Sequence, residues 1–580
     1  MKAVTLIAAI VCVSGLRALQ QEDDGCSAIQ QALSTHKACH CFTAGLSEQN
    51  EGVWIGCTRK DMPEIHKALN AFENETVVSK LWIWDSLLPV IPSNLFSHVR
   101  PQMLVCESSD LRKFREGAFD PLGERLRVLE LKNNIINDID GREFGALRHL
   151  RRLDLSGNKL RLLSKQSFGS LASLHVLSLY KNQIAHMEDG SFAGIPRLRR
   201  LNLGHNSLAK LSARSFAGLP ELEHLNLEDN KIMSIEDGAF DQLKQLKSLN
   251  LGGNLLTSVR LRALPVLGKL LLNYNVFYSL DNVNLDDLGA LHSLSLDRNH
   301  IERVSKDQFK SVAHLKTLSL ASNQLRHIAN GAFDALTQLE TLSLQNNQLE
   351  RLPDGLFGPL KHLRHLFLSQ NTLVQLDEHT LHGLNALRVL GLAHNKVGRV
   401  HRRALSHLFS LESLYLNDNR LPTLPNLTLH YAHLSKLLAV DLSDNPWQCD
   451  CQLLWLAKWL QSDSGHVLNV HATQCAHSDT PLSLMAESLE ETCDGDGGWM
   501  RSVQQGHSVW ITVIGAVLAV VSVLILLAIA VLYLQEGRLL SHKTVTAHAY
   551  DIRRVPSDMV TLIPKSSTVI EKRVRFEEGS

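Results

Sequence analysis

The chain has 580 residues with 59 basic and 59 acidic side chains, so its formal net charge is zero. This balance argues against a nucleic-acid-binding protein, which typically has a pI above roughly 9. A hydrophobic content of 44% argues against a disordered chain, and an aromatic content of only 6% means that the apolar residues are mostly aliphatic. Leu is the most abundant of these aliphatic residues. A core built so largely from one residue type suggests an internal repeat.

Residues 1–18 are predicted to be a secretory signal peptide. Lys2 supplies the positive charge at the start, and residues 3–13 form a mostly apolar run that is too short to cross a bilayer of about 30 Å. Gly15 and Ala18 offer two alternative cleavage sites. The mature chain is therefore expected in an oxidising compartment, where disulfides persist.

The cysteines gather at the two ends of the mature chain. Of ten cysteines, Cys12 leaves with the signal peptide and Cys106 stands apart from the rest. The remaining eight form two groups of four: Cys26, Cys39, Cys41 and Cys57, then Cys449, Cys451, Cys475 and Cys493. Four cysteines alone allow three disulfide connectivities. A structural metal site is not expected in either group.

Between the two cysteine groups a pattern of leucine and asparagine recurs. LxxLxLxxN runs from Leu126 to Asn134 and returns at intervals of 24 residues, with one step of 21 residues and one of 26. The later copies begin at Leu150, Leu174, Leu198, Leu222, Leu246, Leu267, Leu291, Leu315, Leu339, Leu363, Leu387, Leu411 and Leu437. Two degenerate copies begin at Val78 and Pro101, which makes sixteen copies within residues 78–445.

This pattern resembles the leucine-rich repeat family in its 24-residue extracellular form. The resemblance implies an α/β solenoid: a horseshoe with a parallel concave β-sheet. The alternating Leu predict a short strand whose Leu face inward. The Asn of each copy is expected to satisfy buried backbone groups and to stack into a ladder. A recurring Phe is expected in the core, namely Phe144, Phe168, Phe192, Phe216, Phe240, Phe309, Phe333 and Phe357.

The two cysteine groups resemble the flanking modules that cap such arrays. The resemblance implies the pairs Cys26–Cys41, Cys39–Cys57, Cys449–Cys475 and Cys451–Cys493. Cys106 occupies an inward Leu position and is interpreted as a buried free thiol, with a bridge to Cys57 as the alternative. Asn74 and Asn426 begin N-glycosylation sequons.

The sequence contains no recognisable catalytic motif. HExxH, GxSxG, P-loop and dinucleotide-binding patterns are all absent from it. Three HxxH pairs occur, but the two His of a pair do not share a helix face on a 24-residue coil. We therefore expect no enzyme activity, no cofactor and no metal, and we place the function on the concave sheet.

Two candidate binding sites lie in the first half of the array. Trp82 and Trp84, on the opening strand, are predicted to face outward, where exposed Trp is favoured in interfaces; packing under the N-terminal cap is the alternative. The second candidate lies at the 21-residue copy. Glycine backbone beside an apolar and an aromatic side chain predicts a pocket there; the alternative is that the repeat sequence has simply diverged without a functional role. This candidate comprises Gly252, Gly253, Leu271 and Tyr274.

A third candidate site lies later in the array. Phe367, Gly391 and Tyr415 share one outward phase in three successive copies. Two aromatic walls would then stand about 9.6 Å apart, two strand spacings, across a glycine floor. His365 and His394 are expected close by.

The sequence after the repeats predicts a membrane anchor. Residues 509–534 carry no charge and are long enough for a transmembrane helix. Gly515 and Ala519 within them form a small-xxx-small pair, which suggests a homodimer. In the tail, Arg573, Val574 and Phe576 resemble a docking motif for type-1 protein phosphatase, with an unstructured anchor as the alternative.

The sequence as a whole predicts a single-pass type I plasma-membrane protein with its N-terminus outside. Its predicted parts are the signal peptide 1–18, cap 19–77, repeats 78–445, cap 446–493, stalk 494–508, span 509–534 and cytoplasmic tail 535–580. The ectodomain resembles that of Toll-like receptors, but the tail is too short for their signalling domain. We expect an adhesion molecule, receptor or co-receptor that binds an extracellular protein on the concave face. The alternative is an innate-immune receptor for a microbial, lipid or glycan ligand.

Overall fold

The computed structural model describes residues 24–34, 37–43, 52–72, 74–169, 171–426, 436–462, 466–476, 478 and 480–495. The predicted signal peptide, transmembrane span and cytoplasmic tail lie outside this part, and with them the homodimer and phosphatase motifs. Within it, no helix is both long enough and apolar enough to cross a membrane.

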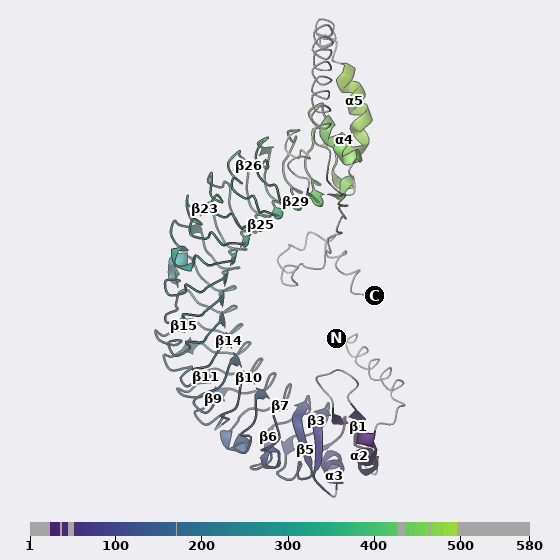
Figure 1. The fold of residues 1–580 in the computed structure, drawn as a ribbon, viewed down its shortest axis with the longest axis vertical. Helices are drawn as coiled ribbons and strands as arrows, with labels where there is room; N and C mark the ends of the chain where they lie inside the picture. The colour runs from purple at the N-terminus through teal and green to yellow at the C-terminus, as the bar shows by residue number, and fades with distance from the viewer. Residues whose placement is uncertain are drawn as a thin grey trace, which may run out of the picture. The chain divides into compact units, whose positions relative to one another are not determined.

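A sheet that is parallel except for the antiparallel β1–β2 pair lines the inner side of the curved repeat array (Figure 1). It has 19 strands, of which β1, β2 and β31 flank the array and the other sixteen lie one per predicted repeat. Those sixteen are β3 (Thr76–Trp84), β5 (Val99–Glu107), β7 (Val128–Glu130), β8 (Arg152–Asp154), β10 (Val176–Ser178), β12 (Arg200–Asn202), β14 (His224–Asn226), β16 (Ser248–Asn250), β18 (Lys269–Leu271), β20 (Ser293–Ser295), β22 (Thr317–Ser319), β24 (Thr341–Ser343), β25 (His365–Phe367), β27 (Val389–Gly391), β29 (Ser413–Tyr415) and β30 (Ala439–Asp441).

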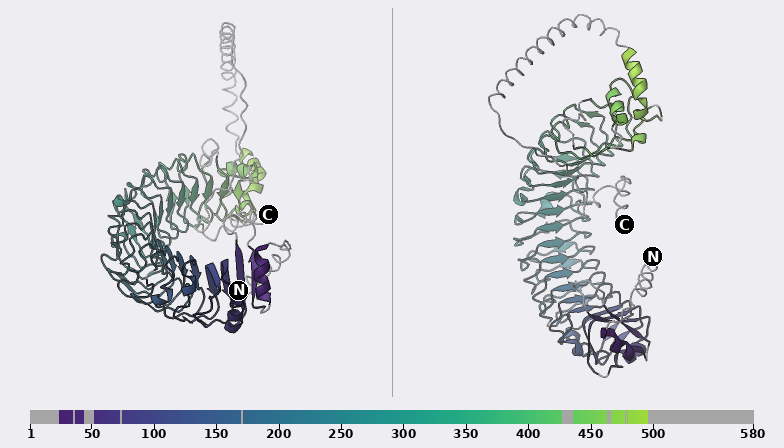
Figure 2. Two further views of the ribbon diagram at one scale, coloured as in Figure 1. Left: turned by 60° about the horizontal axis from the view of Figure 1, so that its bottom comes forward. Right: turned by 45° about the vertical axis from the view of Figure 1, so that its right-hand side comes forward.

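Shorter elements form the opposite side of the coils (Figure 2). The strands there are β4 (Val90–Ile91), β6 (Lys113–Phe114), β9 (Leu162–Leu163), β11 (His186–Met187), β13 (Lys210–Leu211), β15 (Ser234–Ile235), β17 (Val259–Arg260), β19 (Val283–Asn284), β21 (Arg303–Val304), β23 (His327–Ile328), β26 (Gln375–Leu376) and β28 (Arg399–Val400). Four 3-10 turns accompany them: η1 (Asp120–Leu122), η2 (Gly141–Phe144), η3 (Leu280–Asn282) and η4 (Lys310–Val312).

Each end of the array carries a cap. The first contains α2 (Asp24–Ser34), β1 (Cys39–Thr43), β2 (Val53–Thr58) and α3 (Met62–Leu69). The second contains α4 (Leu454–Ser462), β31 (Val467–Leu468), η5 (Val470–Ala472), η6 (Leu482–Met485) and α5 (Ala486–Gly495). All four disulfides implied by the family resemblance are present. The two caps cover the apolar surface that the array would otherwise expose at its ends.

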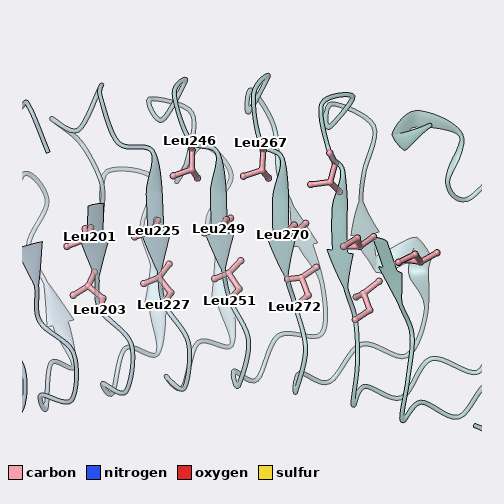
Figure 3. Close-up of a cluster of buried hydrophobic side chains, with 14 of the residues drawn as sticks. Leu201, Leu203, Leu225, Leu227, Leu246, Leu249, Leu251, Leu267, Leu270 and Leu272 are labelled. Atoms are coloured by element: carbon pink, nitrogen blue, oxygen red, sulfur yellow. The ribbon is translucent and has the colours of Figure 1, made fainter. Parts of the chain in front are cut away.

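Leu side chains from successive strands fill the core, as the period of the sequence predicts. Figure 3 shows Leu225, Leu227 and their equivalents in neighbouring coils pointing to one side of the sheet. The recurring Phe are buried as well. The rings of Phe192, Phe216 and Phe240 stack at centroid distances of 6.3 and 5.8 Å.

The predicted asparagine ladder is confirmed. Asn230 accepts a hydrogen bond from the backbone N–H of Leu208 at 3.0 Å and donates to the carbonyl oxygens of Leu203 and Leu227 at 3.0 and 3.1 Å. Equivalent bonds recur at Asn206 and Asn254. One buried side chain per coil therefore satisfies backbone groups of two coils.

Cys106 is a buried free thiol. The alternative bridge to Cys57 is wrong, because Cys57 is bonded to Cys39. Burial raises the pKa of the Cys106 thiol to about 12, so the thiol stays protonated at neutral pH.

Candidate functional site

The opening strand of the array presents two tryptophans to solvent. In β3, Leu81 and Ile83 point into the core, so Trp82 and Trp84 lie on the outer face. Trp82 is 36% exposed and Trp84 is half-buried, and their rings stack with centroids 6.1 Å apart. Among the described residues, Trp82 is therefore partly exposed on the outer face and Trp84 less so.

Residues of the N-terminal cap extend this aromatic surface. The ammonium of Lys80 lies between two rings, 4.9 Å from the centroid of Trp54 and 5.2 Å from that of Trp82. Phe42, which is 42% exposed, faces Trp54 across the β1–β2 pair. We call Phe42, Trp54, Lys80, Trp82 and Trp84 the aromatic platform.

The cap holds the aromatic platform in a fixed geometry. β2 pairs with β3 in parallel and places Gly56 opposite Trp82. A side chain at Gly56 would come within 3.0 Å of the Phe42 ring, so the glycine makes room for that ring. The disulfide between Cys39 and Cys57 joins β1 to β2. The aromatic rings therefore stand on paired, cross-linked strands instead of on loops.

Further along the sheet lies a group of four compensating charges, Glu130, Lys132, Arg152 and Asp154, which we call the charged quartet. The Lys132 ammonium is 2.8 Å from Glu130 and 3.5 Å from Asp154. The Arg152 guanidinium is 3.3 Å from Glu130 and 3.5 Å from Asp154. Both carboxylates are buried but paired, so the charged quartet adds polar character to the concave face without net charge.

The predicted pocket at the 21-residue copy is not formed over its glycines. A side chain at Gly252 would lie 3.0 Å from the amide of Asn273, and one at Gly253 would collide with the Asp229 carboxylate. Neighbouring coils thus fill the space. Tyr274 is nevertheless 52% exposed, with the Arg298 guanidinium 4.9 Å from its ring, while Leu271 in β18 is half-buried.

The predicted slot between Phe367 and Tyr415 is closed. Phe367 is only 7% exposed, because its ring lies 3.5 Å from the position that a Cβ of Gly391 would occupy. The ring lies over the neighbouring glycine instead of standing as a wall. Tyr415 is half-buried, and burial raises the pKa of its hydroxyl.

Both histidines near this slot contact a neighbouring side chain. His365 lies 3.3 Å from the Thr341 hydroxyl, and burial, with Arg364 and Arg388, lowers its pKa to about 4. His394 contacts the Asp418 carboxylate at 2.5 Å. Throughout the described residues, no group of three His, Cys, Asp or Glu is arranged to hold a metal ion.

Two hollows in the described part lie away from the concave strands. One, of about 610 Å³, lies beside the C-terminal cap and includes Leu424, Trp455 and the sequon residue Asn426. The other, of about 540 Å³, is lined by Arg112, Lys113, Ile135, Asn137, Lys159, Arg161 and Gln183. Asn74, the other sequon residue, is exposed.

Sequence reasoning missed Phe42, Trp54 and Lys80. The alternation Val53-Trp54-Ile55-Gly56-Cys57 would have placed Trp54 on the outer face, but the cap residues do not follow the 24-residue phase. It also missed the charged quartet, although Glu130 and Asp154 occupy equivalent outward positions in adjacent copies.

Comparison with known proteins supports the repeat assignment. A family model described as leucine rich repeat matches residues 124–184, 172–232, 225–277, 289–349 and 337–397. These segments contain the concave strands from β7 to β27.

Individual relatives resemble only parts of the chain. SLIT and NTRK-like protein 5 of Mus musculus is 38% identical over 76 residues, 13% of this chain and 7% of that protein. A leucine-rich repeat protein of Leptospira interrogans has a TM-score of 0.54 at 26% identity, over 65% of this chain and 92% of that one. Drosophila Toll, solved with Spatzle, has a TM-score of 0.55 at 19% identity, over 78% and 76%. The likeness to Toll shows the fold alone.

Proposed function

We propose that this protein, whose repeats belong to the leucine-rich repeat family, is a cell-surface recognition protein that binds a protein ligand on its concave sheet. The aromatic platform is the observation that carries the proposal. Trp is enriched among the residues that dominate protein–protein binding energy. A platform on rigid strands loses little conformational entropy when a partner binds.

The dimensions of the sheet support a protein ligand. Sixteen strands at about 4.8 Å span roughly 75 Å, and a stable interface needs about 800 Å² on each partner. The charged quartet would lie at the edge of such a footprint, because only β5 separates β3 from β7. A lipid ligand calls for a deep apolar pocket, and the two hollows described above do not lie on the concave strands.

The proposed location is the plasma membrane, with the repeats outside. Four disulfides in the caps fit an oxidising compartment. SLIT and NTRK-like protein 5 offers a partial parallel over the 76 residues that match it. Adhesion, receptor and co-receptor roles all use the same recognition step.

The test is a binding screen with the full-length chain displayed on cells. Soluble extracellular proteins are applied one by one, and bound ligands are titrated against the variant Trp82→Ala/Trp84→Ala. Loss of one to two hot-spot residues should weaken binding at least about 30-fold, or 2 kcal/mol. Surface display of each variant is measured through an epitope tag.

Tyr274→Ala/Tyr278→Ala is the matched control, because both tyrosines are exposed but lie away from the aromatic platform. This control should bind the ligand normally. Normal binding by Trp82→Ala/Trp84→Ala would exclude the aromatic platform as the site. Lipids and glycans are applied to the same cells, and binding of these alone, with no protein bound, would overturn the protein-ligand proposal.

A further inference from the structure

One side of the array carries a continuous row of residues that immediately precede the concave strands. We call it the flank ladder, and it consists of Arg127, Arg151, His175, Arg199, Glu223, Lys247, Gly268, His292, Lys316, Glu340, Arg364, Arg388 and Glu412. The backbone N–H of Arg151 donates to the carbonyl of Arg127 at 2.8 Å, and that of Arg199 to His175 at 2.9 Å. Successive members are therefore direct neighbours.

From Glu223 onward every cation of the flank ladder is ion-paired with an acidic member of the same row. Lys247 contacts Glu223 at 2.8 Å. Glu340 contacts Lys316 at 3.4 Å and Arg364 at 3.3 Å. Arg388 and Glu412 form a further pair at 3.5 Å.

The first four positions of the flank ladder are different. Within the described residues, no carboxylate lies in ion-pair range of Arg127 or Arg151. Arg127 donates to the backbone carbonyl of Glu124 at 3.0 Å, and Arg199 forms a 3.5 Å ion pair with Glu221, which lies outside the flank ladder. Arg151 and Arg199 are exposed.

Other cations adjoin this stretch. Arg148 and Arg197 lie two or three residues before the flank ladder, and Arg200 follows it; all three are exposed. Glu124 is fully exposed and lies 3.9 Å from His149. This stretch therefore carries a local excess of positive charge, although the formal net charge of the whole chain is zero.

We propose that the flank from Arg127 to Arg200 binds a sulfated polysaccharide, independently of the protein ligand. Guanidinium groups bind the oxygens of sulfate and phosphate groups through paired hydrogen bonds. Arg127 and Arg199 are three strand spacings apart, about 14 Å, so one linear polyanion can contact the whole row. The same backbone position carries compensated charges elsewhere, so compact folding does not require the uncompensated Arg127 and Arg151.

A sulfated glycan suits this flank better than a nucleic acid. Single-stranded nucleic acids gain much of their affinity by stacking bases on aromatic rings. The flank ladder between Arg127 and Arg199 carries guanidinium and imidazole groups but no Phe, Tyr or Trp. The disulfides also fit the extracellular space, where sulfated glycans occur.

The experiment measures retention of the purified full-length chain on immobilised heparin as a function of NaCl. The test variant is Arg127→Ser/Arg151→Ser/Arg197→Ser, because the described residues place no carboxylate in ion-pair range of these three guanidinium groups. On single-stranded polyanions each ionic contact contributes about 0.7 to the slope of log affinity against log salt. The slope should therefore fall in magnitude by about 2.

The later part of the flank ladder offers a matched control. Lys316→Ser/Arg364→Ser/Arg388→Ser removes the same number of positive charges, but from the compensated stretch. Its slope should change by less than about 1. Equal slopes in both triple variants would overturn the proposal, because net charge alone would then account for retention.

Two further arms distinguish other sources of binding. A variant of the separate hollow, Arg112→Ser/Lys159→Ser, should keep its heparin affinity; loss there with no loss in the flank variant would contradict the assignment. Retention on a single-stranded RNA column equal to that on heparin would contradict the preference for sulfate. The melting temperature of each variant shows that it is folded.

Discussion

At the scale of single residues, the ladder asparagine has the clearest structural role. Asn230 makes one hydrogen bond through its side-chain oxygen and three through its amide nitrogen, all with backbone groups. A shorter or apolar side chain would leave several of those buried groups without partners. Each buried polar group left without a partner costs free energy, because it has lost its hydrogen bonds to water and gains none in the protein.

Asn230→Ala should therefore destabilise the protein by about 1–3 kcal/mol. Thermal unfolding of the full-length chain, followed by circular dichroism, measures the change. Lys231→Ala, at the exposed neighbouring position, should leave the melting temperature within error. An unchanged melting temperature for Asn230→Ala would show that the ladder is not stabilising.

His365 should make stability depend on pH below neutrality. Its pKa in the folded chain is about 4, below the usual 6.5, because burial disfavours the charged ring. The unfolded chain therefore binds more protons between pH 6.5 and 4, and stability falls as the pH falls through that window.

His365→Gln should reduce that loss by about 1–2 kcal/mol, allowing for the partial exposure of the ring. The measurement is the difference in melting temperature between pH 7 and pH 4.5, compared with the parent chain. Because other groups titrate equally in both proteins, the comparison isolates His365. Identical pH dependence in the two proteins would contradict the buried, neutral imidazole.

At the scale of the elements, the 21-residue copy shows how the array absorbs a deletion. β16 and β18 pair in the usual register, with Leu249 opposite Leu270. The ladder also continues, because Asn275 accepts from the N–H of Leu256 at 3.0 Å. The three missing residues are therefore lost from the return segment and not from the concave strand.

Gly253, beside this copy, is needed for two reasons. Its φ of +65° is unfavourable for other residues, and a side chain would collide with Asp229, which contacts His205 at 2.9 Å. Gly253→Ala should cost about 2–4 kcal/mol. Gly190→Ala is the control: φ is +83° there but nothing lies within 4 Å, so only about 1–2 kcal/mol is expected. Equal melting temperatures of the two variants would contradict the crowding at Gly253.

The sequence predicted these elements well wherever the repeat phase applies. The period located the inward Leu, the Phe stack and the Asn ladder, because each depends on local alternation repeated every 24 residues. It failed at Phe367, whose ring orientation depends on the missing side chain of Gly391, 24 residues away. It also failed at Phe42 and Trp54, which belong to a hairpin outside the repeat.

At the scale of the whole molecule, overall neutrality conceals an uneven distribution of charge. The flank ladder is compensated from Glu223 onward but not at Arg127 and Arg151. The aromatic platform, by contrast, is apolar around one ammonium group. Two surfaces of different chemistry thus lie in the N-terminal part of the array, and we expect them to serve different ligands.

The central claim is that the aromatic platform is the contact surface for a protein ligand. Hydroxyl-radical footprinting of the full-length chain, with and without a ligand found in the screen, tests it most directly. The account predicts that modification of Trp54, Trp82 and Phe42 falls when the ligand binds, while Tyr274 and Tyr278 remain unchanged. Unchanged modification of the three platform residues, with protection elsewhere on the array, would contradict it.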